Sequence, residues 1–154
     1  MALKLASKPV VEKHVQALYD ECQELKSKGV TPSLKVILVG NHQPSLIYTR
    51  HKKKFCDRIG AECEILHYDA NISEEELTKE IETQVQDPKV HGCFVQLPLP
   101  DHLAHMDVNK LISPDKDVDG FHPFNVDAVV RGDEGPEFLY ACTPKGVMTL
   151  LQEY

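Results

Sequence analysis

The chain lacks several features that would each point to a particular class of protein. Its 154 residues contain no tryptophan, and acidic residues outnumber basic ones by 24 to 17, which gives a formal net charge of -7. A nucleic-acid-binding protein would need a basic surface instead. No apolar run approaches the roughly 20 residues that span a membrane, and residues 1–10 resemble neither a signal peptide nor a transit peptide. These absences favour a cytoplasmic protein that binds neither nucleic acid nor a membrane.

The absence of several sequence motifs excludes further kinds of binding and catalytic site. The five cysteines have no CxxC spacing, so we expect reduced thiols, no disulfide framework and no metal site. The sequence has no GxxxxGK phosphate loop, no GxGxxG dinucleotide fingerprint, no GxSxG turn and no HExxH motif. It does have the composition of a globular domain, with 42% hydrophobic and 27% charged residues, and enough length to bury one core.

Apolar periodicity predicts alternating helices and strands. We expect strands over 34–39, 63–68, 92–97 and 138–142. We expect helices over 9–28, 44–59, 73–86 and 101–112, and a short helix near 125–131. A final helix should follow, with Thr143 as its N-cap and Pro144 as its first residue. Ser73 and Glu76 form a capping-box pattern. Strands joined by helices of this length form a parallel sheet with right-handed crossovers. The predicted fold is α/β, in three layers: a mostly parallel sheet with helices on both faces.

The segment GNHQPSLIYTRHKKKF (40–55) begins as a loop and continues as a helix. Ligands of open parallel sheets bind beyond the carboxyl ends of the strands, where this segment starts. Helical spacing puts Tyr48, Lys52, Phe55 and Ile59 on one apolar stripe, with Lys52 as its one lysine. A partly buried ammonium loses hydration, which favours the neutral form that a proton-transfer lysine requires. The alternative, which periodicity alone favours, is a solvated Lys52 that snorkels at the edge of the stripe.

Two further polar positions reach the same region. Gln96 ends the third predicted strand, although a strand-end amide is also an ordinary structural residue. In SPDKDVDGFHP (113–123), the residues Asp117, Asp119 and His122 resemble a metal loop, but no glutamate closes it at the spacing that calcium requires. A turn, which Asp-Gly favours, and a carboxylate that binds an amidine-like heterocycle edge both remain open.

Four segments together resemble the bifunctional methylenetetrahydrofolate dehydrogenase/methenyltetrahydrofolate cyclohydrolase family, in the family's order and spacing: SLIYTRHKKKFCDRIG, GCFVQLPLP, SPDKDVDGFHPFN and ACTPKGVM. The resemblance implies one-carbon chemistry on a folate substrate, methylene- or methenyl-tetrahydrofolate, with NADP or NAD as the cofactor and a homodimer in the full-length form. It leaves open whether the basic run at 50–54 attracts the anionic glutamate tail or is a solvated face. An unrelated flavodoxin-like domain would require all four matches to be accidental.

The resemblance also assigns roles to residues. It implies that Lys52 is the central catalytic residue, that Gln96 hydrogen-bonds and tunes it, and that Tyr48 packs along the folate rings. Asp119 would bind the pterin. The other substrate-binding residues that the resemblance implies are Ser45, Leu97, Pro98 and Gly120. With the resemblance, a catalytic Lys52 is favoured over a snorkelling one.

The sequence departs from the family in one respect. The family's Rossmann-type domain, which binds NADP or NAD, follows the CTPxG helix, and this sequence ends at Tyr154 inside that helix. We therefore expect a folate-binding catalytic domain over 1–142, the truncated start of the interdomain helix over 143–154, and no cofactor-binding residues.

Three further expectations follow from that reading. Val147, Leu150 and Leu151 would be exposed, folate binding would be weak, and the chain would tend to self-associate. A non-catalytic folate-binding or assembly module is the alternative function. Finally, the sharp exit from the third strand predicts a cis peptide in QLPLP, at Leu97–Pro98.

Overall fold

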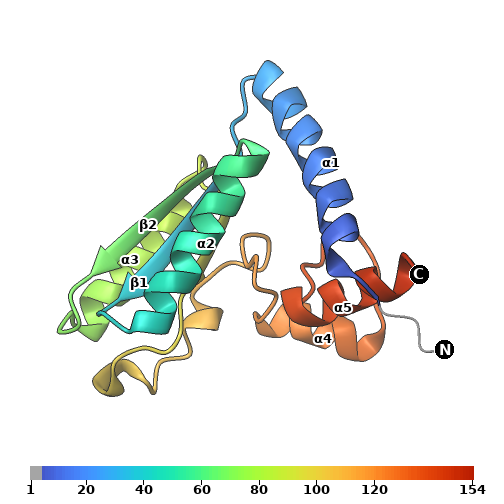
Figure 1. The fold of residues 1–154 in the computed structure, drawn as a ribbon. Coiled ribbons are helices and arrows are strands. Elements are labelled where there is room, and N and C mark those ends of the chain that lie inside the picture. The colour runs from blue at the N-terminus through green and yellow to red at the C-terminus, as the bar shows by residue number, and fades with distance from the viewer. Residues whose placement is uncertain (1–4) are drawn as a thin grey trace.

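A three-stranded parallel sheet lies at the centre of the computed structural model, which describes residues 5–154 (Figure 1). Its strands are β1 (Ser33–Val39), β2 (Glu62–Tyr68) and β3 (Gly92–Val95), in the order β2-β1-β3. All of β3 and the last four residues of β1 are buried, as their continuous apolar runs require. The predicted α/β fold with a parallel sheet is confirmed.

Helices cover both faces of this sheet. Helix α2 (Gln43–Ile59) joins β1 to β2, and α3 (Glu74–Gln86) joins β2 to β3. The first crossover leads from the central strand to one edge and the second leads back past the centre to the other edge. Because parallel crossovers are right-handed, the two helices lie on opposite faces, as Figure 1 shows. The capping box of Ser73 and Glu76 at the start of α3 is also confirmed.

The remaining helices lie to one side of the sheet (Figure 1). They are α1 (Ser7–Ser27), α4 (Pro123–Arg131) and α5 (Cys142–Gln152). Helix α1 buries Val15 and Cys22, whereas Val11, Leu18 and Leu25 are exposed. No helix among residues 5–154 is both long enough and apolar enough to cross a membrane.

Two predicted elements are wrong, the first being the helix over 101–112. The segment forms two 3-10 turns, Asp101–Leu103 and Val108–Lys110. Leu103 and Val108 are both buried, at 1% and 2% exposure. Asp107, between the two turns, has a ψ of 73°, which lies outside the helical region, so no continuous helix passes through it.

The strand predicted over 138–142 is also absent from the described chain. Residues 138–141 are irregular, and the backbone N–H of Leu139 donates to Asn125 Oδ1 at 3.1 Å instead of to a neighbouring strand. Helix α5 accordingly begins at Cys142 with Ala141 as N-cap, so the predicted cap at Thr143 is wrong and Pro144 is the third helical residue.

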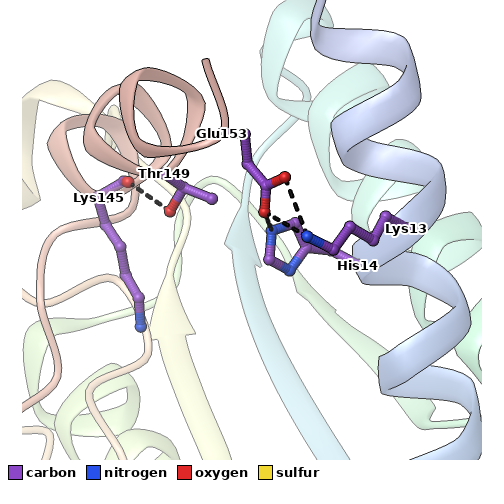
Figure 2. A network of polar contacts seen from close by, with 5 residues as sticks. All are labelled: Lys13, His14, Lys145, Thr149 and Glu153. Atoms are coloured by element: carbon purple, nitrogen blue, oxygen red, sulfur yellow. Dashed lines mark hydrogen bonds and ion pairs between the residues drawn. The ribbon is translucent and has the colours of Figure 1, made fainter.

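Figure 2 shows the ion pair that joins the two ends of the chain. Lys13 Nζ on α1 donates to both carboxylate oxygens of Glu153, at 2.7 and 3.0 Å, and His14 Nε2 lies 4.0 Å from the same carboxylate. The phenol of Tyr154 donates to the carbonyl of Ala6 at 3.1 Å. These contacts dock the end of α5 against the start of α1.

We expect the contact between the end of α5 and the start of α1 to be lost at low pH. The hydrogen bond from Lys13 holds the pKa of Glu153 below its ordinary value. The contact therefore stabilises the fold above the ordinary carboxyl pKa and is lost as the pH falls through the lowered one. We expect the protection factors of amides in the last turn of α5 to fall between about pH 5 and about pH 3 in hydrogen-exchange measurements.

The matched control is Glu153→Gln, which cannot carry the charge. Its last turn should show low protection factors at both pH values. A parent chain whose α5 protection does not change over this range would contradict the role given to Glu153.

Candidate functional site

The candidate site lies at the carboxyl edge, which we define as the edge formed by the carboxyl ends of the three strands. There β1 runs into Gly40 and the start of α2, and β3 runs into Gln96. A loop of residues 113–122, called the Asp119 loop below, lies beside β3 through a backbone bridge between Cys93 and Asp117. Three segments far apart in sequence therefore meet at this edge, which is where parallel sheets bind ligands.

Lys52 lies between a carboxylate and an aromatic ring. Its Nζ is 3.5 Å from Asp119 Oδ1 and 3.4 Å from the centroid of the Phe94 ring. The lysine side chain is 36% exposed and that of Asp119 is 26% exposed. The ammonium therefore lies at the boundary between the core and solvent, where it can meet a ligand.

The face of α2 that carries Lys52 differs from the predicted stripe. The helix buries Ser45, Thr49 and Cys56, whereas Tyr48 is 63% exposed and Phe55 is 41% exposed. The prediction gave too much weight to aromatic residues, because small and polar side chains let α2 pack closely on the sheet. Lys52 is still the one lysine at the border of the buried face, one turn beyond Thr49.

Asp117 folds the Asp119 loop. Its carboxylate is 2% exposed and accepts hydrogen bonds from the backbone of Gly120 and His122, at 3.1 and 2.7 Å, and from Asn125 Nδ2 at 3.0 Å. These bonds leave Asp119 at the tip, facing Lys52. The described residues contain no group of three or more His, Cys, Asp or Glu placed to hold a metal ion.

Gln96 and the two residues after it close the site along β3. Gln96 Nε2 donates to the carbonyl of Leu97 at 2.8 Å, and Gln96 Oε1 is buried without a hydrogen-bond partner. Among the described residues no hydrogen bond joins Gln96 to Lys52, so that contact stays a prediction. Leu97 is 47% exposed, and the Leu97–Pro98 peptide is cis, as predicted.

Ser45 has a structural part in this arrangement. It is 2% exposed, lies 2.9 Å from His42 Nδ1 and donates to the carbonyl of Leu97 at 3.3 Å. The hydroxyl thus ties the first turn of α2 to the segment after β3. It holds Leu97 in place rather than pointing into open space.

The cations near Lys52 divide into two kinds. Lys53 donates to the carbonyl of Cys63 on β2 at 3.1 Å and lies 3.5 Å from Asp57. Within the described part of the chain, no carboxylate pairs with the exposed residues Arg50, Lys54 and Arg58. The basic run therefore contributes unneutralised charge to the outer surface of α2.

The cysteines are free thiols, as predicted. Burial raises the pKa of Cys56 to about 12 and that of Cys93 to about 11. Cys142 at the start of α5 donates to the carbonyl of Val118 at 3.3 Å, and burial together with the nearby Asp119 charge raises its pKa. These thiols are therefore poor nucleophiles at neutral pH.

A hollow of about 810 Å³ lies between α4 and α5 and reaches Gly120 and Phe121 of the Asp119 loop. Its walls are mainly apolar and include Val126, Val129 and Met148. As predicted for α5, Val147 and Leu151 are exposed, at 54% and 53%, but Leu150 is half-buried.

Comparison with known proteins identifies the family of the chain. Residues 5–119 match the family described as "Tetrahydrofolate dehydrogenase/cyclohydrolase, catalytic domain". The chain belongs to this family. The Bifunctional protein FolD of Halalkalibacterium halodurans is 45% identical over 152 residues, which are 99% of this chain and 53% of the relative. The protein of the same name from Bacillus subtilis is 46% identical over 138 residues, 90% of this chain and 48% of the relative.

Solved structures of the family have the same fold. The crystal structure of FolD from Campylobacter jejuni superposes with a TM-score of 0.93 at 42% identity and covers 97% of this chain and 52% of that one. FolD from Trypanosoma brucei, solved with NADP cofactor and an inhibitor, superposes with a TM-score of 0.87 at 29% identity, over 98% and 51% of the two chains. The chain thus spans about half the length of the relatives that it matches.

Sequence reasoning missed two groups that build the candidate site. One is Phe94 beneath Lys52, and the other is the pair Asp117 and Asn125 that fold the Asp119 loop. For Phe94 a signal was available, since residues two apart on a strand share a face and Gln96 follows two residues later. Asp117 had been considered only as a metal ligand or a turn residue.

Gly120 gives a direct test of how the Asp119 loop packs. Its φ is 72°, and a Cβ there would overlap the backbone of Tyr140 and Ala141, whereas Gly132 has nearly the same φ, 73°, and open space around its Cα. Gly132→Ala should cost about 1–2 kcal/mol through its backbone conformation alone. Gly120→Ala should cost roughly 1–3 kcal/mol more, because the neighbouring backbone must move.

Urea denaturation of both variants measures this difference. Equal losses of unfolding free energy for Gly120→Ala and Gly132→Ala would show that the Asp119 loop does not pack against residues 139–141.

Proposed function

We propose that this chain is the folate-binding catalytic domain of a methylenetetrahydrofolate dehydrogenase/methenyltetrahydrofolate cyclohydrolase. The observation that carries the proposal is the half-buried Lys52 ammonium, 3.5 Å from Asp119 at the carboxyl edge, in a chain whose residues 5–119 match this family. A lysine at such a boundary can exchange protons with a ligand, whereas the fully solvated Lys54 on the outer surface of α2 cannot reach one.

The cyclohydrolase step needs three proton transfers. The oxygen of water bonds to the cationic methenyl carbon and releases one proton, which leaves a neutral carbinol. One carbon–nitrogen bond of the bridge then breaks, the departing nitrogen takes up a proton, and the carbinol hydroxyl gives its remaining proton to solvent as it becomes the carbonyl of the 10-formyl product. A neutral Lys52 amine can accept the first proton and return it at the nitrogen. A cationic substrate beside Lys52 favours that neutral amine, because like charges repel.

Asp119 is suited to hold the pterin. A carboxylate accepts two parallel N–H bonds from an amino group and an adjacent ring N–H. The contact between Asp119 and Lys52 is long, at 3.5 Å, so pterin binding would draw the carboxylate away from the lysine at small cost. Tyr48 is 63% exposed one turn before Lys52 and offers a flat surface for the rest of the ring system.

Gln96 would hydrogen-bond to Lys52 once Asp119 has turned from the lysine to the pterin. Its Oε1 is buried and has no donor, and such an acceptor costs free energy until it gains a partner. Alternation along β3 puts Gln96 on the same face as Phe94, which contacts Lys52. A hydrogen bond from the Lys52 ammonium to Gln96 Oε1 would therefore keep the lysine in the site during the reaction.

The dehydrogenase step would operate only when this domain is joined to a dinucleotide-binding domain. NADP or NAD would then accept the hydride, and this sequence has no GxGxxG fingerprint to hold either. We expect no saturable binding of either nucleotide to this chain in calorimetric titration. A homodimer in the full-length form and a cytoplasmic location belong to the same proposal. A non-catalytic folate-binding module is the alternative, and the absence of hydrolysis by the parent chain would favour it.

Hydrolysis of methenyl-tetrahydrofolate by the parent chain and by Lys52→Met tests the proposal. The substitution removes the proton carrier and keeps most of the side-chain length, so we expect the rate to fall at least about 100-fold. Circular dichroism should show an unchanged fold.

The matched control is Lys53→Met, one residue further along α2. Lys53 contacts the Cys63 carbonyl and Asp57 rather than the site, so hydrolysis should stay within about threefold of the parent. The proposal fails if Lys52→Met keeps the parent rate, or if Lys53→Met causes the same loss.

A further inference from the structure

The ring of Phe94 is a fixed part of the sheet. Phe94 is 3% exposed and belongs to β3, where it packs in the same core as Val36 and Val95. Its face is turned to α2, because Lys52 Nζ lies 3.4 Å from the ring centroid. The centre of that face carries negative charge density and attracts a cation.

The two groups that contact Lys52 differ in how firmly the surrounding structure fixes their positions. Asp119 lies at the tip of a loop, is 26% exposed and is 3.5 Å from the ammonium. Phe94 lies in a buried strand, and its ring contacts the ammonium at 3.4 Å from the centroid. If the carboxylate turns to a ligand, the ring stays where it is.

We propose that Phe94 is a positioning residue, whose ring face holds the Lys52 ammonium at the carboxyl edge while Asp119 binds substrate. The side chain of lysine has many rotamers, and a cation–π contact on a rigid strand restricts them without occupying the polar groups of the site. The effect on catalysis rests on the proposed cyclohydrolase function, whereas the contact itself does not.

A measurement without substrate tests the contact. In a chain with ¹³C-labelled lysine, the ring current of Phe94 should shift the ε-methylene protons of Lys52 upfield of all other lysines. Lys52→Met assigns the signal by removing it. Phe94→Leu, a swap of one buried apolar residue for another, should return the signal to the position of the exposed lysines. A Lys52 signal that does not change in Phe94→Leu would overturn the proposal, whatever the chain catalyses.

Kinetics then separates an electrostatic role from packing. Phenylalanine with one, two or three ring fluorines at position 94 nearly keeps the ring's size and progressively weakens its negative face. We expect kcat for methenyl-tetrahydrofolate hydrolysis to fall stepwise, by about 3- to 10-fold over the series, with KM nearly unchanged. The same series at Phe138, which packs against Phe124 instead, should leave kcat unchanged.

The outcomes distinguish the two proposals. A constant kcat across the Phe94 series, with an active parent, would reduce Phe94 to a core residue. An inactive parent whose Lys52 signal is nevertheless shifted by the ring would overturn the proposed cyclohydrolase function and support the contact.

Discussion

The buried carboxylate of Asp117 is the constraint on which the site depends. A buried charge is costly unless donors surround it, and here two backbone N–H groups and the Asn125 amide satisfy it. These hydrogen bonds hold residues 117–122 in one conformation beside β3. Asp119 is held at the tip of the same loop, so the position of this partly exposed carboxylate follows from the hydrogen bonds of a buried one. The contact between Asp119 and Lys52 is a consequence of this packing.

The fold was predictable where local pattern and tertiary packing agree. Continuous apolar runs identified β1 and β3, Ser73 and Glu76 identified the start of α3, and crossover handedness gave both helical layers. The secondary structure was predicted wrongly in segments that form neither a regular helix nor a strand. The segment 101–112 forms two short 3-10 turns, each of which buries one apolar residue, Leu103 or Val108. The segment 138–142 is apolar like a strand, but its backbone bonds to a side chain and to no strand.

The residues of the candidate site were easier to predict from the sequence than the contacts between them. Strand-end logic and the family resemblance led to Lys52, Gln96 and Asp119, and the structure brings Lys52 and Asp119 together at one edge. The helical face was misjudged because exposed Tyr48 and Phe55 were counted as buried. Tyrosine and phenylalanine on a surface helix are ambiguous, since the same side chains serve a core or a ligand. Strand alternation puts Phe94 on the same face as Gln96, but its contact with Lys52 depends on the distance between α2 and β3, which no local pattern encodes.

The proposed function requires that the carboxyl edge, to which α2, β3 and the Asp119 loop contribute residues, binds a folate. Titrating the ¹⁵N-labelled chain with 5-formyl-tetrahydrofolate, a stable reduced folate, tests it most directly through amide chemical shifts. We expect saturable changes at Tyr48, Lys52, Gln96 and Asp119, and none at Lys35 and Glu64, which lie in the amino-terminal halves of β1 and β2. Changes confined to the hollow between α4 and α5, or no saturable change at the carboxyl edge, would contradict it.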